Sequence, residues 1–291
     1  FAMKILIAGG TGFIGKTLVP FLVKNGHEVN VLTRRKMVDV ENIHYYRWDI
    51  DKEFIDSQAF DGVEALINMT GANIGEKDWT VDRKNELLNS RVRPLDLLLK
   101  YIIESGNKIK VLISSSAVGY YGAVTTDHVF TEEDKNGNDF PAYVCRLWED
   151  TALKFREVAD RVVILRKGLV IGQGGGVYQK LQPLAKLGLN VALGSGNQYF
   201  PLVCINDLIS VYNYVLEHNE IDGVFNIVSN EHVTMNEFSE KMLHSFGRRK
   251  FLPNIPAFII KILFRERSQM LLQGSRVSND KIRRTGFEFW Y

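Results

Sequence analysis

A glycine-rich segment near the start of the chain limits the fold more than any other feature of the sequence. It reads Gly9-x-x-Gly12-x-x-Gly15, follows the apolar run Lys4–Ala8 and leads into an amphipathic stretch at residues 15–25. This order predicts a buried strand, a tight turn and a helix. Glycines permit the turn and let the backbone approach a pyrophosphate, which the helix N-terminus attracts. The segment therefore predicts a dinucleotide-binding loop, the alternative being a glycine-rich turn without a ligand.

Strand-like and helix-like runs alternate along the first half of the chain. Beyond the opening unit, the sequence predicts strands at 27–32, 62–69, 110–114 and 161–165, and helices at 90–104 and around 148–158. Such alternation is typical of βαβ units and of a parallel sheet with helices on both faces. We therefore expect an α/β fold, a Rossmann doubly wound parallel sheet at residues 3–170 with a smaller C-terminal lobe at residues 171–291. A strand near residues 223–228 is expected to return to the main sheet.

The composition argues against several classes of protein. The 291 residues carry 36 Lys and Arg against 34 Asp and Glu, and this net charge of +2 disfavours a nucleic acid or a membrane as partner. No apolar run of about 18 residues predicts a transmembrane helix. Two cysteines, Cys145 and Cys204, form neither a disulfide framework nor a metal site. We expect a cytoplasmic protein without a metal, a small-molecule substrate, and a monomer or homodimer.

The residues after the second predicted strand indicate which dinucleotide is bound. An NAD site usually places a carboxylate here, where it accepts a hydrogen bond from the ribose 2′-OH. This chain instead has Thr33-Arg34-Arg35, and guanidinium groups suit a 2′-phosphate through their charge and fork geometry. The sequence therefore predicts NADP(H), with NAD(H) as the less favoured coenzyme. The alternative is that the basic cluster is only a solvated surface turn.

The segment Gly9–Gly15, GGTGFIG, resembles the extended short-chain dehydrogenase/reductase superfamily, which includes sugar-nucleotide epimerases and dehydratases. The resemblance implies that Asp49-Ile50 borders the adenine and that Thr70-Gly71-Ala72 lies beside the ribose and pyrophosphate. For both segments the alternative is an ordinary loop. In full, the residues expected to contact the coenzyme are Gly9, Thr11, Gly12, Phe13, Ile14, Thr33, Arg34, Arg35, Asp49, Ile50, Thr70, Gly71, Ala72, Ser114 and Arg146.

Members of this superfamily use a Ser or Thr with a Tyr-x-x-x-Lys pair, in which Tyr exchanges a proton and Lys holds the nicotinamide ribose. By resemblance, Ser116 occupies the catalytic Ser position and Arg146 the Lys position. The Tyr position then falls on Ala142, so the pair is degenerate. Tyr143 is the alternative proton donor, although one step along a helix turns a side chain by about 100°. Arg146 can hold a ribose but donates no proton near neutral pH.

Further segments resemble one branch of this superfamily, the atypical YfcH-like epimerase family, whose members are labelled nucleoside-diphosphate-sugar epimerases or cell-division inhibitors. They include Thr70–Trp79, Ser116–Gly122, Val144–Glu149, Leu165–Gly172, Gly194–Gln198 and Met270–Val277. The resemblance spans essentially the whole chain and implies an NADP(H) site and a family-specific C-terminal domain, but no particular substrate. Cys204 and Asn206 replace the His and Asp usual in relatives, in a segment that we expect to be structural. Gln198, Tyr199 and Phe200 are expected to line a substrate pocket.

Two functions agree with these features. The first is an NADP(H)-dependent oxidoreductase or epimerase that acts on a hydroxyl or carbonyl of a small substrate, with sugar nucleotides among the candidates. In that function Ser116 polarises the substrate oxygen and Arg146 holds the ribose. The second is a non-catalytic NADP(H)-binding sensor or scaffold, which the missing Tyr-x-x-x-Lys pair supports. We favour the enzyme.

Overall fold

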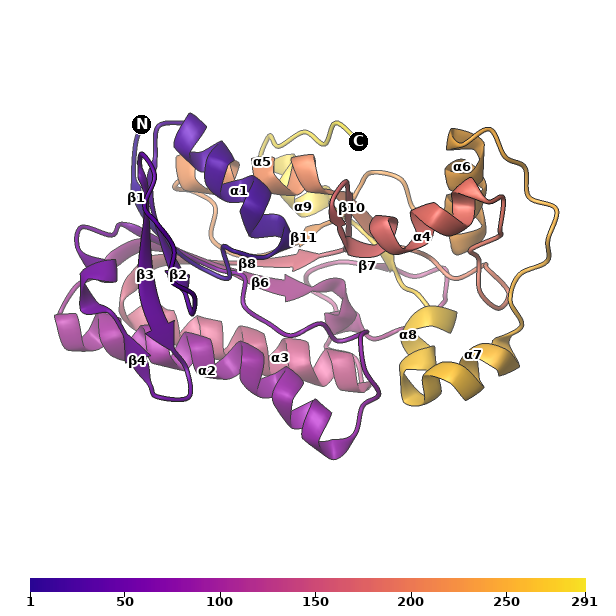
Figure 1. Cartoon of the computed structure of the whole chain (residues 1–291), viewed down its shortest axis with the longest axis horizontal. Helices are drawn as coiled ribbons and strands as arrows, with labels where there is room; N and C mark the ends of the chain where they lie inside the picture. The colour runs from indigo at the N-terminus through magenta and orange to yellow at the C-terminus, as the bar shows by residue number, and fades with distance from the viewer.

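The computed structural model describes all 291 residues and has a central sheet between two layers of helices (Figure 1). The strands of this sheet are β1 (Lys4–Ala8), β2 (Glu28–Thr33), β3 (Ile43–Asp49), β4 (Phe54–Ile55), β5 (Ala65–Asn68), β6 (Ile109–Ala117), β8 (Ala159–Lys167) and β11 (Gly223–Ile227). Their order is β11-β8-β6-β5-β1-β2-β3-β4, and only β4 is antiparallel to its neighbour. Strands β2 to β4 lie on one side of β1, and β5 and the later strands lie on the other side. Open α/β sheets bind their ligands at such a switch in strand order, which here falls between β1 and β5. The predicted Rossmann doubly wound sheet is confirmed.

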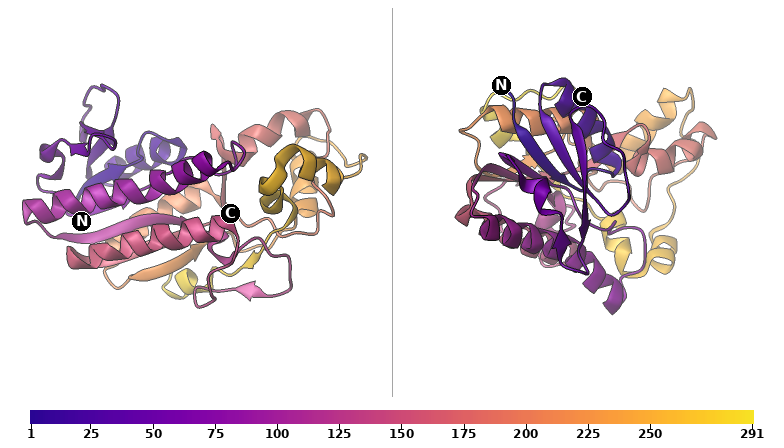
Figure 2. Two further views of the ribbon diagram at one scale, coloured as in Figure 1. Left: turned by 90° about the horizontal axis from the view of Figure 1, so that it is seen from below. Right: turned by 60° about the vertical axis from the view of Figure 1, so that its left-hand side comes forward.

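Alternate residues of the strands face different helical layers, as the pleat of a strand requires. One layer contains α1 (Phe13–Lys24), α5 (Ile205–Glu217) and α9 (Asp280–Arg284), and the other contains α2 (Val81–Ser105) and α3 (Phe140–Leu153). On β1, Ile5 and Ile7 pack against the first layer, whereas Leu6 and Ala8 pack against the second. Helices α2 and α3 run side by side beneath the sheet (Figure 2). No helix is long and apolar enough to span a membrane.

A smaller lobe extends from one end of the sheet (Figure 1). Its helices are α4 (Gly176–Lys186), α6 (Met235–Ser245), α7 (Ala257–Phe264) and α8 (Ser268–Leu272). Two short parallel pairs link it to the sheet: β9 (Leu169–Gly172) with β10 (Leu202–Cys204), and β7 (Val129–Phe130) with β12 (Arg276–Val277). The single-turn 3-10 helices are η1 (Ser57–Phe60), η2 (Val118–Tyr121), η3 (Lys154–Glu157) and η4 (Arg265–Arg267).

After the predicted boundary at residues 170 and 171 the chain returns to the Rossmann core, and α5 and the C-terminal residues return along with the strand expected near residues 223–228. Strand β11 pairs with β8, and the buried side of α5 packs on the same face of the sheet as α1. Ile282 and Phe287, close to the C-terminus, join that core as well. Periodicity reveals the apolar side of a helix, but it does not say which surface that side will cover.

Candidate coenzyme and substrate site

The glycine loop forms an open cradle at the carboxyl end of β1. A Cβ atom on Gly9, which has φ of 81°, would lie 2.7 Å from the carbonyl carbon of Met69, and one on Gly15 would lie 2.2 Å from the oxygen of Gly10. The fold itself therefore requires glycine at both positions. At Gly12, however, the nearest atom to such a Cβ is 3.6 Å away. This open space beside Gly12 leaves room for a ligand to approach the backbone.

The start of α1 has hydrogen-bond donors to offer to that ligand. Gly12 caps the helix without a side-chain hydrogen bond, and the first turn contains no acidic residue. The backbone N–H groups of Phe13 and Ile14 donate no hydrogen bond within the protein. Free N–H groups and the positive end of a helix dipole together bind anions well. The residues present thus fit the pyrophosphate of a dinucleotide.

The other predicted coenzyme residues lie along the same edge of the sheet. At the end of β2, the backbone N–H of Arg35 donates to Thr33 Oγ1 at 3.1 Å, and the Arg34 and Arg35 side chains are exposed without an ion pair. Asp49 ends β3, where it accepts a hydrogen bond from the backbone of Lys52. The specific contacts of these residues with a coenzyme stay predictions.

The loop after β5 borders the cradle. Thr70 Oγ1 donates to Asn68 Oδ1 at 2.8 Å, and the backbone N–H of Ala72 donates to Ser90 Oγ at 2.9 Å. Gly71 lies against the Arg91 guanidinium, whose carbon would be 3.1 Å from a Cβ at this position. The loop is therefore held between the glycine cradle and α2.

The glycines at 172–176 connect the small lobe to the cradle. A Cβ on Gly175 would lie 2.3 Å from the ring of Phe13, and one on Gly172 would lie 2.5 Å from Ile205. Because side chains have no space here, glycine allows this loop to pack directly on the residue that begins α1. The loop therefore covers one side of the dinucleotide segment.

A cavity of about 240 Å³ continues from this edge toward the lobe. The ends of β6 and β8 and the N-terminal half of α3 form one side of it, and the lobe segments 198–201 and 270–275 form the other. Its wall is largely apolar and includes Val144, Trp148 and Leu271. Gln198, Tyr199 and Phe200 line it, as the sequence predicts. Cys204 and Asn206 lie outside its wall, at the junction of β10 and α5.

Two cationic side chains, Arg91 and Lys167, line this apolar cavity, and neither forms an ion pair. The Arg91 side chain is 8% exposed and donates to the carbonyl oxygen of Leu87. Asp139 also lines the cavity, but both of its carboxylate oxygens accept backbone N–H groups. Burial, and to a lesser extent the positive charge of Arg91, lower the pKa of Lys167 to about 8. An unpaired cation in an apolar setting is unfavourable, so these groups are suited to meet an anion or a polar ligand atom.

Sequence reasoning missed both cations. Arg91 belongs to an otherwise amphipathic helix, and its burial depends on the residues packed above it. Lys167 is the last residue of the buried strand β8, at the carboxyl edge of the sheet. A charged residue at that position is the one local signal that could have identified it.

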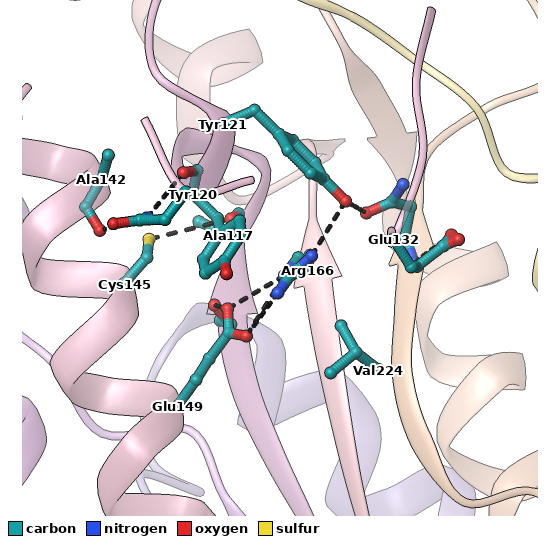
Figure 3. A network of polar contacts seen from close by, with 12 residues as sticks. Ala117, Tyr120, Tyr121, Glu132, Ala142, Cys145, Glu149, Arg166 and Val224 are labelled. Carbon is teal, nitrogen blue, oxygen red and sulfur yellow. Dashed lines mark hydrogen bonds and ion pairs between the residues drawn. The ribbon is translucent and has the colours of Figure 1, made fainter. Parts of the chain in front are cut away.

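Glu149 of α3 and Arg166 of β8 form a buried ion pair (Figure 3), and the predicted catalytic residue Ser116 belongs to the same network. Its hydroxyl donates to Glu149 Oε2 at 2.6 Å, and Glu149 Oε1 lies 2.7 Å from Arg166 Nη2. Burial alone would lower the pKa of Arg166, but the hydrogen bond to Glu149 and the charge of Glu149 raise it overall. Ser116 does not line the cavity, which corrects its predicted role in polarising a substrate oxygen.

Tyr121 extends the same network to the edge strand β11. Arg166 Nη1 donates to the Tyr121 hydroxyl at 3.1 Å, and that hydroxyl donates to Asn226 Oδ1 at 2.6 Å. Burial raises the pKa of Tyr121 to about 12, although the neighbouring Arg166 opposes this shift. Tyr121 therefore stays a neutral phenol and is committed to the core. Ser114 is fully buried as well, and its hydroxyl has no hydrogen-bond partner.

The structure also corrects the predicted roles of Arg146 and Tyr143. Asp139 caps the N-terminus of α3 and so determines which side of the helix faces the sheet. Tyr143 is 43% exposed, and the Arg146 guanidinium lies over its ring at 5.5 Å, so the two side chains contact each other at the surface. Neither lines the cavity. Cys145 of α3, which does face the cavity, lies one position earlier in the chain than Arg146, about 100° around the helix.

The residues of α3 that face the cavity include Pro141 and Cys145. The Cys145 thiol donates to the carbonyl oxygen of Ala117 at 3.7 Å. Burial, and to a lesser extent the negative charge of Glu149, raise the pKa of Cys145 to about 12. This thiol is therefore not an activated nucleophile. Helix α3 thus supplies neither a Tyr nor a Lys to the cavity. No group of three or more His, Cys, Asp or Glu residues in the structure could hold a metal ion.

A doubly wound parallel sheet with an open glycine cradle at its reversal point defines a dinucleotide-binding protein of the Rossmann class. The chain belongs to the NAD dependent epimerase/dehydratase family, which it matches over residues 5–228, and residues 255–291 match a domain of unknown function, DUF1731. This confirms the resemblance to the epimerase/dehydratase superfamily.

Relatives occur in bacteria and in animals. An epimerase family protein of Mycobacterium leprae, ML0860, is 32% identical over 289 residues, which cover 98% of this chain and 91% of the relative. The human epimerase family protein SDR39U1 is 31% identical over 292 residues, which cover 99% and 95%. A crystal structure of human SDR39U1 isoform 2 with NADPH has a TM-score of 0.85 and 29% identity, and covers 99% of this chain and 95% of that one.

A crystal structure of a nucleoside-diphosphate sugar epimerase of Corynebacterium glutamicum has a TM-score of 0.78 and 26% identity. The match covers 100% of this chain and 56% of that one. A UDP-glucose 4-epimerase of Thermotoga maritima shares the fold at 22% identity. The similarity therefore extends over both the Rossmann core and the small lobe. Some of these proteins are named for a substrate, such as UDP-glucose, and others only for the epimerase family.

Proposed function

We propose that this protein binds NADP(H) and is an oxidoreductase or epimerase that acts on a carbonyl or hydroxyl of a small molecule. The observation that carries the proposal is that the open cradle at Gly12 and the apolar cavity share one edge of the sheet. Membership of the epimerase/dehydratase family and the NADPH complex of human SDR39U1 support it. When bound, the coenzyme would supply hydride exchange at its nicotinamide ring.

Each part of the site has a distinct task in this proposal. The N–H groups at the start of α1 hold the phosphates, and Arg34 and Arg35 hold the 2′-phosphate. The apolar wall around Val144 and Leu271 excludes water and encloses the substrate. A compact carbonyl compound suits a largely apolar cavity of about 240 Å³ better than a whole sugar nucleotide does.

A non-catalytic NADP(H) sensor is the second candidate, since α3 presents Pro141 and Cys145 to the cavity rather than Tyr and Lys. A panel of aldehydes, ketones and sugar nucleotides, tested with NADPH and with NADP+, separates the two functions. We expect oxidation of NADPH with at least one small carbonyl compound. Tight binding of NADPH without turnover of any compound would favour the sensor, and a lack of binding would refute both.

Coenzyme selectivity provides a separate prediction. Replacing Arg34 with alanine is expected to weaken NADPH binding by about 10- to 100-fold and to leave NADH binding nearly unchanged, because a charge-assisted hydrogen bond contributes about 1.5–3 kcal/mol. Titration calorimetry with both coenzymes measures the ratio of affinities. The exposed Arg156, which pairs with Asp222 on the surface, is a matched control. An unchanged ratio in the Arg34→Ala variant would show that the basic turn is not part of the site.

A further inference from the structure

Lys167 lies where a residue on the cavity wall can reach a bound substrate. It ends β8, beside Ala117 of β6, and both residues line the cavity. Its ammonium donates one hydrogen bond, to Ser115 Oγ at 3.3 Å. Ser115 Oγ in turn lies 3.4 Å from the Tyr212 hydroxyl of α5, which holds it in place. An ammonium has three N–H donors, so two remain for a ligand.

The order of strands assigns Lys167 to the substrate rather than to the phosphates. The glycine cradle follows β1, whereas β8 is separated from β1 by β5 and β6. Arg91 differs in this respect, because its guanidinium packs against Gly71 in the loop that borders the cradle. Of the two cations in the cavity, Lys167 is therefore the one whose strand does not adjoin the glycine cradle.

We propose that Lys167 is the proton donor and acceptor of this protein, in the place of the missing Tyr-x-x-x-Lys pair. This proposal rests on the proposed oxidoreductase function. In the reductive direction bound reduced coenzyme would supply a hydride to the carbonyl carbon, and as the carbonyl π bond breaks the oxygen would take a proton from Lys167 Nζ. The neutral amine then regains a proton from solvent, and the products are an alcohol and oxidised coenzyme. In the reverse direction the neutral amine removes the hydroxyl proton.

The surroundings of Lys167 suit this task. The groups near it are Arg91 of α2, Cys145 of α3 and Ser115 of β6, and Ser115 in turn meets the Tyr212 hydroxyl of α5. Burial and the positive charge of Arg91 lower its pKa to about 8, close to the pH at which a proton must be exchanged. Because the reductive step needs the ammonium form, its rate should fall as the pH rises through about 8.

The acidity of Lys167 can be measured without any substrate. Trace labelling of the intact protein with acetic anhydride between pH 6 and 11, read at Lys167 by peptide mass spectrometry, follows the neutral amine. Half-maximal labelling is expected near pH 8. A midpoint near the pKa of an unperturbed lysine, about 10.4, would contradict the proposal.

Three variants test the proton transfer itself. Lys167→Met removes the proton and keeps the stem, Lys167→Arg keeps the charge without donating a proton, and Lys100→Met is a control on the exposed side of α2. Lys167→Met should fold, with a Tm no lower than the wild type, since it removes an unpaired cation from the cavity wall. It should bind NADPH within about threefold and lose about 100-fold or more in kcat, the range for general acid catalysis. Lys167→Arg should not restore the rate.

The possible results separate this proposal from the proposed function. Turnover retained in Lys167→Met, or restored in Lys167→Arg, would refute the role of Lys167 and leave the oxidoreductase function intact. Binding of NADPH by the wild type without turnover of any carbonyl compound would refute the oxidoreductase function, and the role of Lys167 with it. Loss of turnover in Lys167→Met alone, with NADPH binding preserved, would support both.

Discussion

Replacing Glu149 with alanine is expected to destabilise the protein by about 3–5 kcal/mol, the usual cost of leaving one partner of a buried ion pair alone. The side chains of Glu149 and Arg166 are 7% and 4% exposed, and the carboxylate also accepts the Ser116 hydroxyl. The alanine variant would leave the guanidinium charged, since a group of this kind does not lose its proton in proteins. Urea unfolding followed by circular dichroism measures the change.

Two further variants make this test specific. Asp51→Ala removes a carboxylate that pairs with Arg93 but is 90% exposed, and it should change the stability by less than about 1 kcal/mol. The double variant Glu149→Leu with Arg166→Met removes both charges and should recover much of the loss, because apolar replacements of a buried pair are often tolerated. If Glu149→Ala were no worse than Asp51→Ala, the network would not stabilise the sheet edge as we infer.

Replacing Gly12 with valine is expected to leave the fold intact and to weaken NADPH binding by about 100-fold or more, which corresponds to about 2.7 kcal/mol. Gly12 has φ of −81° and ψ of −172°, an extended conformation that valine adopts readily. Its Cβ would meet no protein atom closer than 3.6 Å, so the added methyl groups would occupy the space proposed for the pyrophosphate. Calorimetric titration with NADPH and a thermal unfolding curve together test this prediction.

The matched variant Gly15→Ala should behave in the opposite way. Its Cβ would lie 2.2 Å from the carbonyl oxygen of Gly10, so the turn itself would have to move, at a cost of about 3 kcal/mol. A Gly12→Val variant that binds NADPH like the wild type would show that the space beside Gly12 is not the phosphate site. A Gly12→Val variant as unstable as Gly15→Ala would show that glycine serves only the fold there.

The features that the sequence could reveal are local ones. The strand, glycine turn and helix at residues 4–24 follow from apolar periodicity and from the need for tight backbone contacts at Gly9 and Gly15. The basic turn at Arg34 and Arg35 is equally local, because both residues directly follow their strand. The doubly wound architecture follows from the alternation of such units, since parallel strands need crossover helices.

The side chains that line the cavity could not be predicted from the sequence. Lys167 meets Ser115 across 52 residues of chain, and Tyr121 meets Asn226 across 105. No periodic pattern records such pairs, because they depend on which strands become neighbours and on how the lobe folds back. The predictions for Ser116, Arg146 and Tyr143 failed for the related reason that they relied on alignment with a motif that this chain has lost.

The sequence by itself determined that this chain forms a dinucleotide-binding sheet, because hydrophobic period and glycine geometry act over a few residues. Only the tertiary structure decided which side chains reach the cavity. On α3, a shift of one residue exchanges the exposed Arg146 for the buried Cys145. The packing of the whole helix on the sheet selects between them, and that packing is the sum of contacts spread over the entire chain.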